Sequence, residues 1–230
     1  MAPIKLVLFD ITGTILQDTG NLLRAFGAAL RTNGIEASHD ELQEWRGAAK
    51  REVISAFVGR QRGSAAAADD GAVQRIYGQF QELLEADFVS HPPIPIAGAE
   101  AVFAWLRERG ILLGATTGYH RKLADSLLHS VGWRDCFRTT VASDEVSRGR
   151  PAPYMIFRAM EAAGVLDVSQ VVTVGDTPLD LQAGANAGVR GIVGVLSGAH
   201  TAERLRREPH THLLPSIADL PRAMSAFGAG

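Results

Sequence analysis

Four short polar segments of this 230-residue sequence hold carboxylate, hydroxyl, amide and cationic groups in patterns that could do chemistry. They are Asp10-Ile11-Thr12-Gly13-Thr14, Thr116-Thr117-Gly118-Tyr119, Arg148-Gly149-Arg150-Pro151 and Gly175-Asp176-Thr177-Pro178-Leu179-Asp180. A carboxylate can act as a covalent nucleophile or bind a hard cation such as Mg²⁺. Hydroxyl and backbone N–H groups can bind phosphate oxygens, and a cation can offset charge that develops in a transition state. Together, the four segments supply what phosphoryl transfer requires.

The elements that must position these groups can be read from the apolar pattern. Five segments rich in Val, Ile and Leu predict buried parallel strands, because they lack clean alternation. They cover residues 4–9, 111–116, 138–142, 171–174 and 191–195. Helical patterns lie between them, at residues 98–109, 121–131, 152–163 and 178–187. This order predicts an α/β fold with a doubly wound, Rossmann-like parallel sheet.

Each polar segment lies at the end of a predicted strand or just beyond it. Asp10 directly follows the apolar run of the first strand, so a buried strand should deliver its carboxylate to a glycine-containing turn. The carboxyl ends of parallel strands share one edge of a sheet, where open α/β sheets bind ligands. Groups spread from residue 10 to residue 180 are therefore expected to converge on one cleft.

A long helical insertion interrupts this α/β rhythm after the first strand. Residues 17–95 contain no strand pattern, and helices are expected at residues 21–32, 40–58 and 73–88, with a small-residue connection at 63–71. We expect an all-helical cap at residues 17–95, beside a core formed by residues 1–16 and 96–230. Connecting segments of this kind often carry function, although an inert helical subdomain is the alternative.

Bulk properties narrow the possible partners and the cellular location. The formal net charge of −2 gives no reason to expect nucleic acid or an anionic membrane as a partner. The single cysteine, Cys136, excludes an intrachain disulfide and fits a reducing compartment. No signal peptide and no apolar run of about 20 residues is visible, so we expect a cytoplasmic protein that does not span a membrane.

In order and spacing, the four segments resemble the haloacid dehalogenase-like superfamily of aspartyl-nucleophile hydrolases. The resemblance covers the whole chain and places a C1-type helical cap in the position of the insertion. It implies that Asp10 is a nucleophile that carries an aspartyl-phosphate intermediate. It also implies a Mg²⁺ site formed by Asp10, Asp176, Asp180 and the backbone carbonyl of Thr12. Such a pairing would keep the Asp10 carboxylate ionised at neutral pH.

The same resemblance assigns roles in binding the phosphoryl group. Thr117 would bind it through its hydroxyl, with help from the Gly118 amide, and Tyr119 is expected to line the cleft. Arg150 stands where most members of the superfamily have lysine. The substrate would be a small phosphonate or phosphate compound, and a cap of this type can mediate homodimer formation.

Thr12 departs from the pattern of most phosphatases in this superfamily, which have a second aspartate at this position. That aspartate protonates the leaving group, and losing a general acid typically costs 10²–10⁴-fold in rate. The phosphonoacetaldehyde hydrolase branch also lacks it and also has arginine at the third segment. In that branch a carbon leaves, and a cap lysine forms a Schiff base with the substrate aldehyde.

Lys50 falls where this cap lysine is expected, and Arg46 lies four residues before it. A Schiff-base lysine must be partly neutral, which nearby cations or a dry pocket favour. Three features differ from that branch: arginine replaces methionine before the cap glycine, Val53 replaces a histidine three residues after the lysine, and Thr12 replaces an alanine. The chain is thus phosphonatase-like rather than a full match.

Simpler interpretations of these residues remain open at this point. Thr12 could satisfy turn hydrogen bonds, Arg150 could pair with a surface acid, and Asp180 could stabilise a helix N-terminus. Lys50 could be a solvated lysine. Two other functions are also open: a phosphatase for sugar phosphates or phosphoglycolate, in which Arg46 and Lys50 bind the substrate anion, and a binding protein with a degenerate site.

Overall fold

The computed structural model describes residues 2–46, 48–63 and 70–228. The chain divides into two compact units, each with its own core. Residues 1–18 and 93–230 form the α/β unit, and residues 19–92 form the helical unit. None of the helices within the described ranges is long and apolar enough to cross a membrane.

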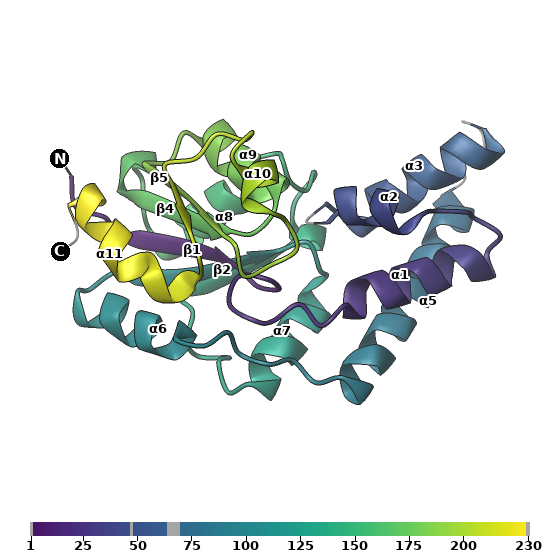
Figure 1. Cartoon of the computed structure of the whole chain (residues 1–230), viewed down its shortest axis with the longest axis horizontal. Helices are drawn as coiled ribbons and strands as arrows, with labels where there is room; N and C mark the ends of the chain where they lie inside the picture. The colour runs from purple at the N-terminus through teal and green to yellow at the C-terminus, as the bar shows by residue number, and fades with distance from the viewer. Residues whose placement is uncertain (1, 47, 64–69, 229–230) are drawn as a thin grey trace. The chain divides into compact units, whose positions relative to one another are not determined.

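The α/β unit is built on a six-stranded parallel sheet with β1 near its centre, in the order β3-β2-β1-β4-β5-β6 (Figure 1). The strands are β1 (Leu6–Asp10), β2 (Leu112–Thr117), β3 (Thr139–Ala142), β4 (Val171–Gly175), β5 (Gly191–Val195) and β6 (His212–Leu214). This confirms the predicted doubly wound sheet. β6 was not predicted, because this strand has only three residues, all half-buried, and its pattern is too short to indicate a strand. It pairs with β5.

Helices flank this sheet on both faces (Figure 1). They are α6 (Ala99–Glu108), α7 (Arg121–Ser130), α8 (Tyr154–Ala163), α9 (Pro178–Ala187), α10 (Ala202–Leu205) and α11 (Leu220–Met224). The helices predicted between the strands are present, with ends that differ by at most two residues. The short α11, which follows the last predicted strand, was not predicted.

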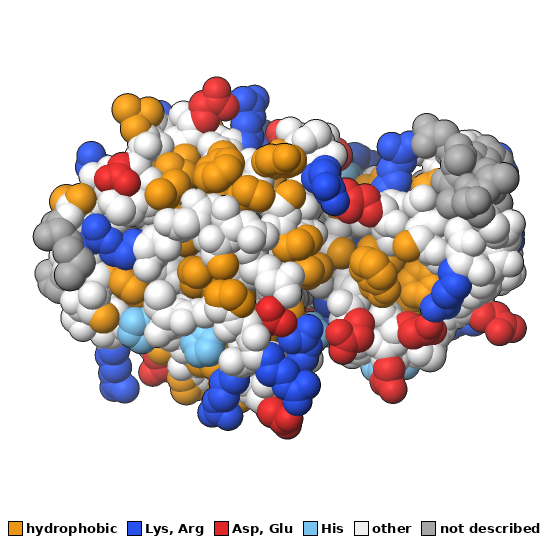
Figure 2. Space-filling view, turned by 90° about the horizontal axis from the view of Figure 1, so that it is seen from above, with side chains coloured by type: hydrophobic (Ala, Val, Ile, Leu, Met, Phe, Trp, Pro, Cys, Tyr) orange, Lys and Arg blue, Asp and Glu red, His pale blue; other side chains and the backbone are white. Residues whose placement is uncertain are grey.

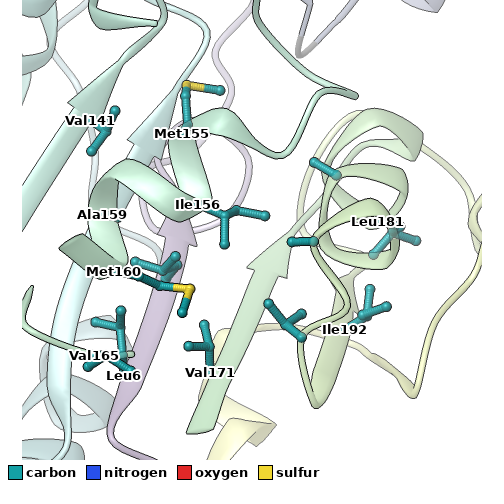
Figure 3. Packing of buried hydrophobic residues seen from close by; sticks show 14 of the residues in the cluster. Leu6, Val141, Met155, Ile156, Ala159, Met160, Val165, Val171, Leu181 and Ile192 are labelled. Carbon is teal, nitrogen blue, oxygen red and sulfur yellow. The ribbon is translucent and has the colours of Figure 1, made fainter. Parts of the chain in front are cut away.

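Side chains alternate along β1, and this alternation sets the face on which Asp10 lies. Leu6 and Leu8 belong to a buried cluster with side chains of α8 and α9, such as Met155 (Figure 3). Phe9 points the other way and meets the ring of Phe103 on α6, with ring centroids 5.7 Å apart. Asp10 has the same parity as Leu6 and Leu8, so its carboxylate emerges on the α8 and α9 face.

The helical unit contains α1 (Asn21–Thr32), α2 (His39–Glu44), α3 (Lys50–Arg62) and α5 (Asp70–Ser90). Its core includes Phe26, whose ring lies 5.3 Å from that of Phe80 and 6.5 Å from that of Phe57. The unit is helical wherever regular structure is described, as predicted. Residues 64–69 of the predicted small-residue connection lie outside the described residues.

The predicted single helix over residues 40–58 is wrong, because α2 ends at Glu44 and α3 begins at Lys50. Ser38 starts α2 with a capping box: its hydroxyl accepts from the Glu41 amide, and the Glu41 carboxylate accepts from the Ser38 amide. The Lys50 ammonium donates hydrogen bonds to the carbonyl oxygens of Trp45 and Ala48. A continuous helix would bond those carbonyls to amides along its own axis.

The surface carries charges of both signs. On the face seen in Figure 2, basic side chains lie among acidic ones. This distribution accompanies a formal net charge of only −2. The expectation that nucleic acid is not a partner stays a prediction.

Candidate active site

Arg150 lies at the centre of a buried polar cluster at the carboxyl edge of the sheet. Its Nη1 donates to Asp10 Oδ1 at 2.7 Å and lies 2.9 Å from Asp180 Oδ1. Its Nη2 donates to the Thr116 hydroxyl at 2.6 Å and to the Thr116 carbonyl at 3.0 Å. Burial lowers the pKa of Arg150, but the carboxylates of Asp180 and Asp10 outweigh it and raise that pKa above its usual value. Arg150 is therefore a charged, buried group and not a surface ion-pair partner.

Three carboxylates gather around this guanidinium. Asp10, Asp176 and Asp180 each offer an oxygen within 4.8 Å of the others, and all three are buried. Within the described ranges, they form the one acidic group that could hold a metal ion. Carboxylate oxygens are the ligands that Mg²⁺ prefers. With all three ionised, the cluster and Arg150 carry a net charge of −2, which a divalent cation would neutralise, so the residues fit the predicted Mg²⁺ site.

Burial is the largest influence on the Asp10 carboxyl and raises its pKa to about 7. The Arg150 guanidinium opposes this shift, and the neighbouring Asp180 carboxylate adds to it. Without a further cation, a substantial share of Asp10 therefore holds a proton at neutral pH. A cation bound at this cluster would favour the ionised, nucleophilic form.

Asp180 has a helix-capping contact as well as its contact with Arg150. Thr177 is the N-cap of α9, and the Asp180 carboxylate accepts from the Thr177 amide at 3.0 Å and from its hydroxyl at 2.6 Å. Pro178 begins the helix, where its missing N–H costs nothing. The capping interpretation of Asp180 is thus correct, yet Oδ1 of the same carboxylate still reaches Arg150.

Asp176 is held by Thr14 and Ala199, to which the sequence pattern assigns no role. The Thr14 hydroxyl donates to its Oδ1 at 3.2 Å, and the Ala199 amide donates to its Oδ2 at 3.1 Å. Gly13 and Gly198 approach so closely that a Cβ on either would lie 2.3 or 1.9 Å from Oδ2. The sequence does contain a signal for these contacts, because Gly198 and Ala199 follow the fifth predicted strand and the carboxyl ends of parallel strands share one edge of the sheet.

The predicted phosphate-binding turn follows β2. The amide of Tyr119 donates to the Thr117 hydroxyl at 3.2 Å, which leaves the hydroxyl proton available for another acceptor. The Ser143 hydroxyl, after β3, lies 2.9 Å from the Gly118 carbonyl oxygen and 3.1 Å from the Tyr119 carbonyl oxygen. These contacts hold the turn in place. Tyr119 itself is buried.

Thr12 lies in the turn after β1 and is half-buried. Its backbone forms an isolated bridge with Leu16, and the Leu16 carbonyl accepts from the Gly13 amide at 2.6 Å. Gly13 has a φ of +94°, which side chains rarely tolerate, so the glycine permits this turn. The Thr12 carbonyl as a metal ligand stays a prediction.

Lys50 and Arg46 belong to the helical unit. Both are buried, which the solvated-lysine interpretation did not anticipate. The Lys50 ammonium donates to the carbonyls of Trp45 at 3.0 Å and Ala48 at 2.7 Å, and Arg46 Nη1 donates to the Gln43 side chain at 3.2 Å. The arrangement of these two side chains around a substrate bound at Asp10 stays a prediction.

Comparison with known proteins places the chain in a family. Residues 4–188 match the haloacid dehalogenase-like hydrolase model. A phosphonoacetaldehyde hydrolase of Bacillus cereus is 31% identical over 208 residues, which cover 85% of this chain and 77% of the relative.

Solved structures share the fold at lower identity. A phosphonoacetaldehyde hydrolase-like protein from Oleispira antarctica has a TM-score of 0.84 at 23% identity, over 98% of this chain and 93% of its own. A β-phosphoglucomutase from Clostridium difficile also has a TM-score of 0.84, at 15% identity, over 98% and 97% of the two chains. With the family match and the 31% identical relative, the conclusion is direct: the chain belongs to the haloacid dehalogenase-like hydrolases.

Proposed function

We propose that this hydrolase is Mg²⁺-dependent, uses Asp10 as its nucleophile, and cleaves a small phosphonate or related organophosphate in the manner of a phosphonatase. The observation that carries the proposal is the buried Asp10–Arg150 pair, with two further carboxylates close by and threonine where a proton donor would be. A site without a proton donor suits a leaving group that needs no proton, such as a carbon stabilised by an imine.

Asp10 is oriented for attack by its contact with Arg150. Because the guanidinium engages Oδ1, we assign the attack on phosphorus to the other oxygen, Oδ2. Attack forms an O–P bond and breaks the C–P bond, whose electron pair passes to the leaving group. Water then hydrolyses the aspartyl-phosphate to release inorganic phosphate and restore the Asp10 carboxylate.

The phosphoryl oxygens would be bound at the end of β2. The Thr117 hydroxyl accepts from the Tyr119 amide and can donate its own proton to a phosphoryl oxygen. The Gly118 amide lies in the same turn, which Ser143 fixes. When held by Asp10, Asp176, Asp180 and the Thr12 carbonyl, Mg²⁺ supplies positive charge that offsets the charge of the phosphoryl group.

Lys50 is the proposed electron sink for the departing carbon. Its amine would condense with a substrate aldehyde and lose water, and the protonated imine would accept the C–P electron pair as an enamine. Lys50 begins α3, a 13-residue helix, so the positive end of the helix dipole disfavours its ammonium form. Its buried position disfavours that form as well.

Borohydride trapping tests this function sharply, because the sequence has only three lysines, Lys5, Lys50 and Lys122. We expect reduction in the presence of phosphonoacetaldehyde to leave a stable adduct on Lys50, located by peptide mass spectrometry. Phosphate and acetaldehyde should be released in equal amounts, and only with Mg²⁺ present. Asp10→Asn should abolish both releases.

Two substitutions separate imine chemistry from charge. Lys50→Arg keeps a cation but forms no imine, so adduct and acetaldehyde should both disappear. Lys122→Arg, at an exposed position on α7, is the matched control and should change neither. The phosphonatase proposal fails if no adduct forms on Lys50, or if Lys50→Arg still releases acetaldehyde.

A second candidate is a phosphate monoester phosphatase of the sugar phosphate or phosphoglycolate type. One contact favours it: two carbonyl oxygens accept from the Lys50 ammonium and stabilise its charged form. Lys50 and Arg46 would then bind a substrate anion. Phosphate release from a panel of phosphate esters that persists in Lys50→Arg would select this function. Homodimer formation and a cytoplasmic location stay predictions.

A further inference from the structure

Thr116 lies beside the nucleophile, although the segment that contains it was noted for its neighbour Thr117. It pairs in register with Asp10 across β1 and β2, and it is buried. Directly paired residues on neighbouring strands project to the same face of a sheet. The Thr116 side chain therefore reaches the level of the Asp10 carboxylate.

The Arg150 guanidinium is anchored on two sides, and Thr116 provides one of them. Nη1 contacts the carboxylates of Asp10 and Asp180, whereas Nη2 contacts both the hydroxyl and the carbonyl of Thr116. The guanidinium is planar and rigid, so fixing Nη2 also fixes the direction of Nη1. A lysine ammonium carries its three donors on one nitrogen at the end of a flexible stem, so its contacts do not fix one another's direction as those of a planar guanidinium do.

Hydrogen bonds set this orientation of the guanidinium. Arg150, Thr116 and Asp180 line a small cavity whose other walls include Met155 and Ile156. The directional restraint on the buried guanidinium comes from its hydrogen bonds, and the 2.6 Å bond to the Thr116 hydroxyl is the shortest of them.

We propose that Thr116 is a positioning residue that fixes the tilt of Arg150 and thereby holds Asp10 with Oδ2 turned toward the substrate. This inference rests on the proposed role of Asp10 as nucleophile. The role of the Thr116 hydroxyl also depends on the residue at position 150, because the hydroxyl acts by orienting an arginine guanidinium. The effect of losing the hydroxyl should therefore depend on which residue occupies position 150.

A double-mutant cycle tests the coupling. Thr116→Val keeps the shape but removes the hydroxyl, and we expect kcat to fall about 10- to 100-fold, with KM changing less than threefold. In an Arg150→Lys background, the same substitution should change kcat less than threefold. Thr116→Ser keeps the hydroxyl and should restore most of the activity. Thr139→Val, at a half-buried strand position where β3 begins, is the control.

A crystal structure of Thr116→Val gives a readout that does not depend on turnover. The guanidinium should tilt away from its wild-type orientation, and its contact with Asp10 Oδ1 should lengthen. An equal loss of kcat in both backgrounds, failure of Thr116→Ser to recover activity, or an unmoved guanidinium would overturn the inference. If Asp10→Asn instead retains turnover, the proposed function fails, while the crystal structure still decides the positioning role.

Discussion

A methyl group at position 198 should displace a proposed metal ligand. The backbone of Gly198 lies against Asp176, and an added Cβ would sit 1.9 Å from Oδ2 and 2.3 Å from Cγ. Carbon and oxygen atoms pack at about 3.5 Å, so the carboxylate would have to retreat by about 1.5 Å. The backbone of Gly13 also lies close to this oxygen, since an added Cβ there would be 2.3 Å from it. That backbone restricts the retreat of the carboxylate.

This displacement is large on the scale of metal coordination. Ligand distances in protein metal sites hold to about 0.2 Å. Changes to groups that orient a ligand typically cost about 10- to 100-fold in metal affinity. We therefore expect Gly198→Ala to weaken Mg²⁺ binding by at least 10-fold, and phosphate release should need correspondingly more Mg²⁺. Calorimetric titration of Mg²⁺ into the purified protein measures the first effect directly.

Two further variants make this result interpretable. Thr14→Val removes the 3.2 Å hydrogen bond to the same carboxylate without a clash, so a smaller loss of affinity is expected. Gly78→Ala, on α5, is the control, since an added Cβ there meets no atom within 4 Å. Thermal unfolding without Mg²⁺ shows whether each variant is folded. A folded Gly198→Ala protein with wild-type Mg²⁺ affinity would refute the assignment of Asp176 as a ligand.

Three other predictions concern the turn, pH and the core. Thr12→Asp supplies a proton donor, so hydrolysis of alkyl phosphate esters should rise about 100-fold or more, and unchanged rates across such esters would count against the interpretation of Thr12. Because the pKa of Asp10 is raised to about 7, Mg²⁺ affinity should fall about tenfold per unit as pH drops below 7 and level off above it, which titrations from pH 5.5 to 8.5 would check. Phe103→Ala removes ring contacts at 5.7 Å to Phe9 and 5.1 Å to Trp133, and should lower the free energy of unfolding by about 3–5 kcal/mol, measured in urea.

The sheet and the groups at its carboxyl edge were predictable because both follow from local patterns. Buried parallel strands are continuous apolar runs, and the carboxyl ends of such strands share one edge, which is enough to gather Asp10, Arg150 and Asp180. The contacts that orient them were not predictable. Whether Thr116 faces Arg150 depends on strand register, and whether Gly198 meets Asp176 depends on how closely two turns approach.

The break between α2 and α3 shows a different limit of sequence reading. Residues 40–58 have a helical hydrophobic pattern, yet α2 ends at Glu44. The Lys50 ammonium donates to the carbonyl oxygens of Trp45 and Ala48 in the segment that follows. A side chain that bonds backbone carbonyls competes with the helix itself. Hydrophobic periodicity contains no information about such competition.

These carbonyl contacts also affect the reactivity of the Lys50 amine. An amine that donates to two carbonyl oxygens is held in place and stabilised as a cation, whereas imine formation requires its lone pair to be free. The helix dipole at the start of α3 acts in the opposite direction. A phosphonatase would therefore have to release Lys50 from the Trp45 and Ala48 carbonyls when substrate binds, whereas a phosphatase could use the ammonium where it stands. The trapped adduct distinguishes the two because it can form only after that release.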